Sequence, residues 1–120
     1  MADLSGTWLG TYWQRSKPTR FEATIIQAGN TLSGNILDDN YLGEARFSGT
    51  VVGRQINFTK RYLISSPDPV TYIGTISEDE NYIQGQWNIG FIFSGEWEAR
   101  RSGENLVIQT ETRQTVDISV

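Results

Sequence analysis

The 120-residue chain contains neither histidine nor cysteine. This excludes zinc sites built on those side chains, cysteine nucleophiles, and hydrolysis by a Ser-His-Asp triad. Carboxylates, lysine, tyrosine and the hydroxyls of serine and threonine remain for chemistry. We therefore predict no catalytic residue, no metal ion and no cofactor, and we expect a protein that is not an enzyme.

Lys60 is the residue with the most unusual setting. Alternation along its segment places it on the same side as Phe58 and Tyr62, which is the predicted interior. A buried ammonium group is costly unless it is paired, so Lys60 is a candidate to bind a carboxylate or phosphate of a ligand. In that interpretation Tyr12, Tyr62 and Tyr72 supply hydroxyl donors, and Trp87 and Phe93 form walls.

Two other interpretations of Lys60 involve no ligand. Near the end of a strand, its aliphatic stem could carry the ammonium group out to water. Alternatively, Lys60 pairs with a carboxylate at that end of the chain's strands, such as Asp38 or Glu44.

Two acidic runs, Asp38-Asp39 and Glu78-Asp79-Glu80, resemble paired acids for glycoside hydrolysis or calcium ligands. Neither run has the alternating oxygen donors and closing glutamate of a calcium loop. Both fall at predicted turns, where aspartate is common, so surface turn residues are the favoured interpretation.

The elements that must position these residues are strands. Helical periodicity is absent, and alternation of apolar and polar residues recurs between turn residues every 8 to 12 positions. The three prolines, Pro18, Pro67 and Pro69, are expected in links. We predict eight antiparallel strands, over Ser5–Gln14, Thr19–Gln27, Thr31–Asp38, Glu44–Val52, Gln55–Leu63, Val70–Ser77, Tyr82–Ile89 and Ile92–Arg101.

Six of the eight strands share the pattern apolar, any residue, glycine, any residue, apolar, as in Trp8-x-Gly10-x-Tyr12. Glycine is normally disfavoured within a strand. Strands of a small closed barrel must coil sharply, and glycine permits that curvature. The pattern therefore predicts an all-β, eight-stranded up-and-down barrel in a single domain, with the barrel at about 5–101 and a β-prone tail at 102–120.

Strand direction sorts the inward residues into two ends. Links at one end are short, whereas three of the four at the other end, including Arg15–Pro18, are longer, which predicts a mouth there. The expected floor is Trp8, Ile25, Leu32, Val51, Ile56, Ile76, Ile83 and Trp97. The predicted ligand-binding residues near the mouth are Tyr12, Phe21, Lys60, Tyr62, Tyr72, Trp87 and Phe93.

This layout, together with the opening Gly6-Thr7-Trp8, resembles the calycin-type barrels, which include lipocalins, fatty-acid-binding proteins and avidins. The resemblance implies that Trp8 plugs the closed end. Avidins place small polar residues just after this tryptophan to grip biotin, whereas Leu9 to Tyr12 stand here. We therefore expect an avidin-like or lipocalin-like shape without biotin binding, in a bacterial protein.

Charge and hydropathy limit the partners and the location. The net charge is −4 and no basic face is apparent, so no nucleic acid is expected. No apolar run is long enough for a transmembrane helix and the start has no leader pattern, so we expect no membrane partner and a cytoplasmic location.

The first functional hypothesis is a binding protein that holds a small amphipathic or anionic molecule, hydrophobic in part, in the barrel mouth. The alternative is a filled barrel that acts as an interaction or assembly module without a small-molecule ligand. Exposed Trp13, with Leu9 and Ile26, and the tail at 102–120 are candidates for a homodimer contact. An enzyme that uses Lys60 and tyrosine as base and acid has the least support.

Overall fold

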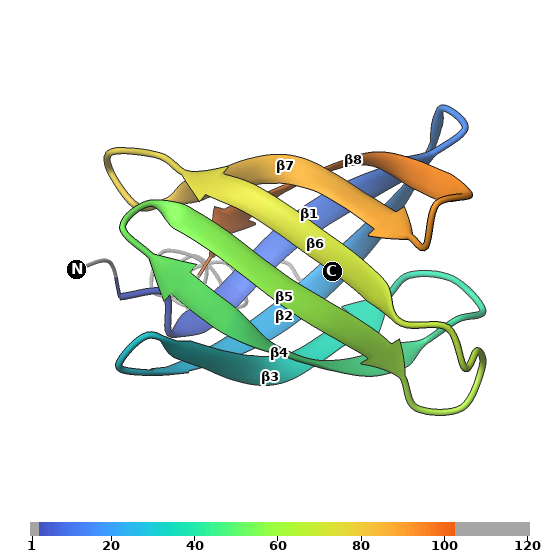
Figure 1. Cartoon of the computed structure of the whole chain (residues 1–120), viewed down its shortest axis with the longest axis horizontal. Coiled ribbons are helices and arrows are strands. Elements are labelled where there is room, and N and C mark those ends of the chain that lie inside the picture. Colours follow the sequence, from blue (N-terminus) through green and yellow to red (C-terminus); the bar gives the residue numbers. More distant parts are fainter. Residues whose placement is uncertain (1–2, 103–120) are drawn as a thin grey trace, which may run out of the picture.

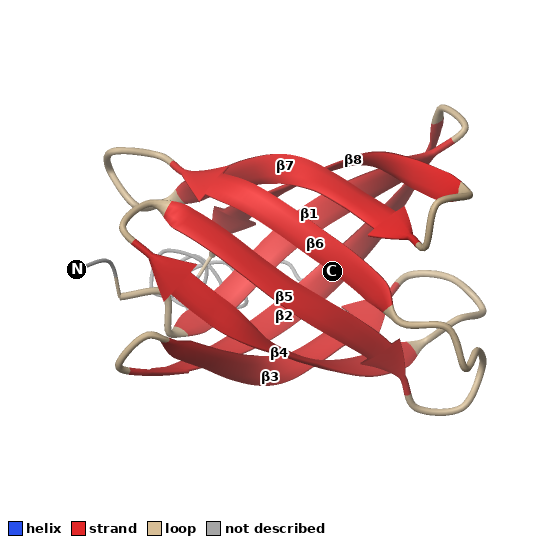
Figure 2. Cartoon of the chain, viewed as in Figure 1, coloured by secondary structure: helices blue, strands red, loops and turns tan. Residues whose placement is uncertain are grey.

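The computed structural model describes residues 3–102, and this part of the chain is built from strands alone (Figure 2). The predicted tail falls outside the described residues except for Ser102. The eight strands are β1 (Gly6–Gln14), β2 (Lys17–Ala28), β3 (Thr31–Asp38), β4 (Glu44–Val52), β5 (Gln55–Tyr62), β6 (Val70–Ile76), β7 (Tyr82–Ile89) and β8 (Phe93–Arg101).

The strands form a closed barrel in which each pairs with its neighbours in sequence (Figure 1). Every pairing is antiparallel, and β8 returns to pair with β1, opposing Tyr12 to Trp97. Closure leaves no sheet edge exposed along the paired strands. The predicted class, strand number and order are confirmed, and the bounds agree closely.

Pro18 was expected in a link, but it is the second residue of β2, opposite Trp13. Its hairpin is tighter than expected, because Arg15 and Ser16 alone form the turn. Both have positive φ, 53° and 69°. Two such residues give the hairpin type whose twist matches that of the flanking strands, so β2 begins earlier than the proline suggested.

The repeated glycines make room for close approaches. A Cβ atom on Gly10 would lie 2.5 Å from the carbonyl oxygen of Glu98 and would overlap the ring of Phe21. A Cβ on Gly95 would lie 2.6 Å from the indole nitrogen of Trp87. Glycine at these positions lets the sheet coil and lets aromatic rings from neighbouring strands lie against the backbone.

The closed end is sealed by the first and last strands. The indole nitrogen of Trp8 donates to the carbonyl of Leu4, and both side chains are buried. The guanidinium of Arg101 lies 4.7 Å from the ring centroid of Trp8 and donates to the carbonyls of Asp3, Ser5 and Glu80. Trp8 thus closes this end of the barrel, which the resemblance to calycin-type barrels implied.

The lower barrel is filled. Phe58 stacks on Tyr72 with centroids 4.7 Å apart, and Trp97 meets both rings edge-on. The void among these residues and the floor measures about 20 Å³, about enough for one water molecule. All eight predicted floor residues are buried: Trp8, Ile25, Leu32, Val51, Ile56, Ile76, Ile83 and Trp97.

The mouth end carries the β1–β2, β3–β4, β5–β6 and β7–β8 links, as Figure 1 shows. Two of them, 39–43 and 63–69, are long, and the hydroxyl of Ser65 ties them together by donating to the carbonyl of Leu42 at 2.8 Å. These loops stand over a part of the interior that the aromatic packing does not fill.

Candidate functional site

A cavity of about 200 Å³ opens at the mouth. Its walls combine aromatic and aliphatic side chains with a few polar groups, which is the usual composition of a small-molecule site. Its volume is below the ~300–1,000 Å³ of sites for drug-sized ligands, so it suits a molecule of about one ring. The lining residues are Tyr12, Gln14, Tyr41, Leu42, Tyr62, Ser66, Asp68, Val70, Tyr72, Trp87, Ile89 and Phe93.

Beneath this cavity lies a buried ion pair between Lys60 of β5 and Asp38 at the end of β3. The Nζ atom of Lys60 is 2.8 Å from Oδ1 and 3.0 Å from Oδ2 of Asp38, and both side chains are fully buried. Asp38 thus neutralises Lys60 within the barrel. Isolated charges would be strongly unfavourable here, whereas a paired and hydrogen-bonded couple is tolerated.

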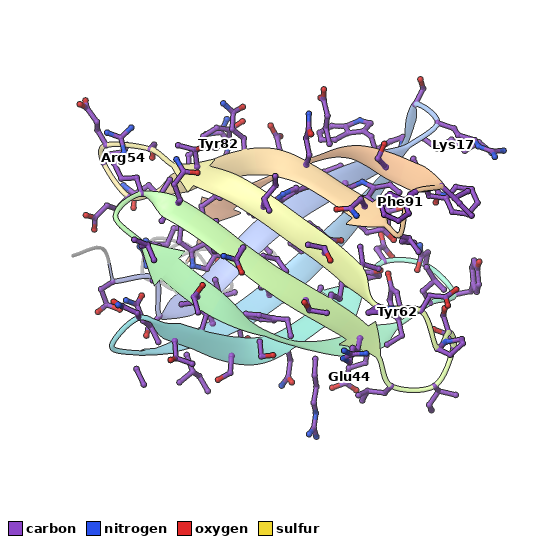
Figure 3. The ribbon with its side chains drawn as sticks, viewed as in Figure 1. Lys17, Glu44, Arg54, Tyr62, Tyr82 and Phe91 are labelled. Atoms are coloured by element: carbon purple, nitrogen blue, oxygen red, sulfur yellow. The ribbon has the colours of Figure 1, made fainter. Side chains whose placement is uncertain are left out.

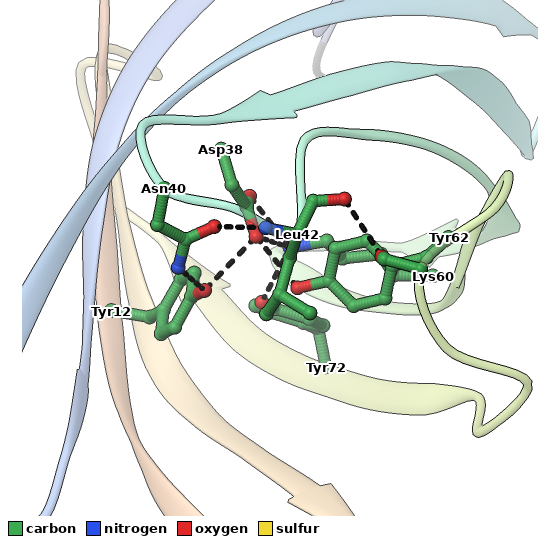
Figure 4. Close-up of polar contacts among 8 residues, drawn as sticks. Tyr12, Asp38, Asn40, Leu42, Lys60, Tyr62 and Tyr72 are labelled. Carbon is green, nitrogen blue, oxygen red and sulfur yellow. Dashed lines mark hydrogen bonds and ion pairs between the residues drawn. The ribbon is translucent and has the colours of Figure 1, made fainter.

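Three tyrosines complete what we call the buried cluster, defined as Tyr12, Asp38, Lys60, Tyr62 and Tyr72 (Figure 4). The hydroxyls of Tyr12 and Tyr62 donate to Oδ2 of Asp38 at 2.9 and 2.6 Å. Lys60 donates to the hydroxyl of Tyr72 at 3.4 Å. Asp38 therefore accepts bonds from three side chains, Tyr12 of β1 and Lys60 and Tyr62 of β5.

The three rings also surround the ammonium group of Lys60. Nζ lies 4.9, 4.7 and 5.6 Å from the centroids of Tyr12, Tyr62 and Tyr72. Ring faces at this distance attract a cation, and the attraction strengthens when water is excluded. The interior thus has the chemistry of a cation site, and the chain's own Lys60 occupies it.

The β3–β4 loop covers the cluster from above. Asn40 donates from its side-chain nitrogen to the hydroxyl of Tyr12 at 3.2 Å, and its side-chain oxygen accepts from the backbone of Leu42 at 2.9 Å. Across residues 3–102, no buried side-chain nitrogen or oxygen lacks a hydrogen-bond partner. Each polar atom of the cluster thus has at least one hydrogen-bond partner within the protein.

Burial sets the protonation of the cluster. It raises the pKa of Tyr12, Tyr62 and Tyr72, and the negative Asp38 acts in the same direction. Burial lowers the pKa of Lys60, and the charge and hydrogen bonds of Asp38 oppose that change. All three phenols thus keep their protons at neutral pH.

The structure brings most of the predicted ligand-binding residues together and separates two of them. Five of the seven line the mouth cavity: Tyr12, Tyr62, Tyr72, Trp87 and Phe93. Lys60 lies below the cavity and not on its wall. Phe21 lies lower still, against Gly10, and lines the small interior void. Phe93 was expected inside, but it is 39% exposed at the rim because β8 begins there.

Two interpretations made from the sequence are corrected. Lys60 does not reach water, since it is fully buried; it pairs with Asp38, one of the two partners weighed, while Glu44 is exposed. Asp38 is not a surface turn residue, because as the last residue of β3 its side chain points inward. Asp79 does lie in an exposed turn, where its carboxylate accepts from the hydroxyl of Ser77 at 2.6 Å.

Sequence reasoning missed the loop contributions to the cavity. Tyr41, Leu42, Ser66 and Asp68 line it from two links that alternation does not describe. The inward positions of Val70 and Ile89 could have been found from the alternation of β6 and β7. Among residues 3–102 there is also no cluster of three or more metal-ligating side chains.

The rim of the mouth carries several large, exposed apolar side chains. Four large residues at the loop tips are 80% exposed or more: Tyr41, Ile64, Phe91 and Ile92. They come from three different links, and Figure 3 shows Phe91 at the end of the barrel where Tyr62 also lies. Exposed apolar side chains at one end of a barrel are candidates for contact with another molecule.

A larger hollow, about 800 Å³, lies on the outer wall of β6, β7 and β8 beside Trp13. It is a shallow groove open to solvent, and exposed side chains such as Gln84, Gln86 and Glu96 border it. The buried polar chemistry of the chain lies at the mouth instead. Volume alone therefore does not identify the site.

No protein-family model matches the chain, and no curated protein sequence is significantly similar to it. Among solved structures, the chain is similar to a de novo designed fluorescence-activating β-barrel, with a TM-score of 0.62 and 14% sequence identity over 82% of this chain and 93% of that one. It is also similar to a variant of the fluorescent protein UnaG, with a TM-score of 0.48 and 12% identity over 83% and 96% of the two chains. At this identity the similarity to the designed barrel shows a shared fold.

No helix in the described part of the chain has the length and hydropathy needed to cross a membrane.

Proposed function

We propose that the protein is a non-enzymatic binding protein that holds a small amphipathic molecule in the barrel mouth. The observation that carries this proposal is the contrast between the two halves of the barrel. The floor is packed to a void of about 20 Å³, whereas the mouth keeps a cavity of about 200 Å³ walled by Tyr62, Trp87 and Phe93.

The apolar rim supports the same proposal. Ile64, Phe91 and Ile92 project from the links around the opening, where they would cover the apolar part of an entering molecule. The designed barrel that shares this fold is fluorescence-activating, which is consistent with small-molecule binding by a barrel of this shape. An avidin-like or lipocalin-like relationship, bacterial origin and cytoplasmic location belong to this proposal as predictions.

The buried cluster argues against catalysis by Lys60. An amine that acts as a base must reach substrate, whereas this one is fully buried, paired with Asp38 and covered by the β3–β4 loop. Its role is to hold three strands and three tyrosines in place beneath the cavity.

The proposal can be tested by native mass spectrometry of the full chain purified from its own source. We expect additional mass bound to the 13.5 kDa chain. Leu42→Trp fills the cavity and should abolish the added mass, whereas Leu37→Trp, on the exposed outer face of β3, should leave it. Equal loss in both variants, or no added mass in the parent, would count against mouth binding.

A second candidate function rests on the same rim. If Tyr41, Ile64, Phe91 and Ile92 meet a second copy of the chain, the mouth is an assembly surface and the protein a homodimer. The same spectra decide this. A dimer without added mass that becomes monomeric in Phe91→Ser/Ile92→Ser would favour the assembly module.

A further inference from the structure

The hydrogen bonds of the buried cluster leave one donor for a ligand. Tyr12 and Tyr62 give their hydroxyl protons to Asp38, so their oxygens can only accept further bonds. Lys60 has three N–H groups and three acceptor atoms, two on Asp38 and one on Tyr72. None of these protons is available to a molecule in the cavity.

Tyr72 differs from the other two tyrosines. Its oxygen accepts from Lys60, and within residues 3–102 its own hydroxyl proton has no acceptor. Tyr72 lines the mouth cavity and is 2% exposed, so a ligand in the cavity would contact a side chain that protein almost fully encloses. A buried donor without an acceptor is unfavourable, and an oxygen atom of a ligand would satisfy it.

The charges of the site disfavour an anion at that position. Lys60 and Asp38 cancel each other, and Asp68 is the single charged residue on the cavity wall in the described part of the chain. A carboxylate in the mouth would lose its hydration without gaining a free cation. Of the two ligand classes that the sequence allowed, the neutral one fits better.

We propose that the mouth selects a neutral molecule of about one planar ring that carries a carbonyl-type oxygen, which accepts a hydrogen bond from Tyr72. This inference rests on the proposed function and specifies its ligand. Trp87 and Phe93 pack against the ring, and Tyr72 fixes the oxygen at the base. The cation of Lys60 orients Tyr72 by occupying its oxygen, so that the proton points away from the pair.

Three probes of the same skeleton test this selection: acetophenone, benzoate and ethylbenzene. Each is titrated into the full chain, and its affinity is measured from NMR shifts of the mouth residues. We expect acetophenone to bind at least about tenfold more tightly than benzoate, because only the anion carries an uncompensated charge.

Two tyrosine variants separate the role of the hydroxyl from the fold. Tyr72→Phe should weaken acetophenone by about 2- to 12-fold, the range for one neutral hydrogen bond, and leave ethylbenzene unchanged. Tyr82→Phe removes a hydroxyl that bonds Glu98, away from the mouth, and should change neither affinity.

The outcomes distinguish this inference from the proposed function on which it rests, which is binding of a small molecule in the mouth. If benzoate binds as tightly as acetophenone, or if Tyr72→Phe affects acetophenone and ethylbenzene alike, the selection by Tyr72 is wrong while mouth binding stands. If none of the three probes shifts the mouth signals, mouth binding itself fails.

Discussion

Replacing Lys60 by methionine tests the buried pair directly. The substitution keeps most of the side-chain volume but leaves Asp38 charged and fully enclosed, with only Tyr12 and Tyr62 as donors. Removing one partner of a buried ion pair typically costs about 3–5 kcal/mol. The full range of this free-energy cost applies, because neither side chain is exposed and water does not screen the pair.

The assay is urea unfolding of the full chain, followed by tryptophan fluorescence. We expect Lys60→Met to lower the free energy of unfolding by about 3–5 kcal/mol, a large part of the ~5–15 kcal/mol of a typical domain. The double variant Asp38→Asn/Lys60→Met should recover most of the loss. Its amide oxygen still accepts from the two tyrosines, and no unpaired charge remains.

A decrease in the free energy of unfolding below about 1 kcal/mol, the size typical of exposed pairs, would refute the reasoning and would indicate that Lys60 is solvated.

Three further predictions concern the rest of the barrel. Gly10→Ala should destabilise the fold by about 1–3 kcal/mol in thermal unfolding, because its methyl group meets Phe21 and a backbone carbonyl, whereas Gly29→Asn, at an open positive-φ turn, should be nearly neutral. Arg101→Lys should cost about 1–3 kcal/mol in urea unfolding by losing bonds to backbone carbonyls, whereas the matched Arg100→Lys should cost under about 0.5 kcal/mol. Burial raises the pKa of the three cluster tyrosines, so the stability that they contribute is present below their ordinary pKa of about 10 and is lost as the pH rises toward their pKa in the folded protein. Tyrosinate absorbance should therefore increase together with the loss of the circular dichroism of the barrel. Ionisation of these tyrosines while the barrel stays folded would contradict their burial.

Strand order and barrel closure could be predicted because the alternation and the glycine pattern act locally. A glycine such as Gly10 indicates both that its strand bends sharply and that an aromatic ring, here Phe21 of the neighbouring strand, lies against it. A slip of one residue would move Trp8 and Trp97 from the interior to water, so the inward face is strongly specified. Of the three prolines, only Pro18 lies within a strand and not in a link, because positive φ at Arg15 and Ser16, which shortens the hairpin, carries no clear sequence signal.

The partners within the site could be predicted only in part. Alternation placed Lys60 and the tyrosines inside, but pairing with Asp38 depends on where β3 ends and how the 39–43 loop folds back. Which tyrosine hydroxyl donates to Asp38 depends on interatomic distances that no sequence pattern encodes, so the different role of Tyr72 could not be predicted. The wall formed by Leu42 and Asp68 depends on loop conformation for the same reason.

The central claim is that small molecules enter the mouth and not another part of the barrel. The four tryptophans report on separate regions: Trp8 at the floor, Trp13 on the outer groove, Trp87 at the mouth and Trp97 in the packed core. The most direct measurement is the NMR spectrum of their indole N–H groups during titration with acetophenone. We predict a saturable shift of the Trp87 signal while the Trp8 signal stays in place. Shifts confined to Trp8 or Trp13, or no shift at Trp87, would contradict it.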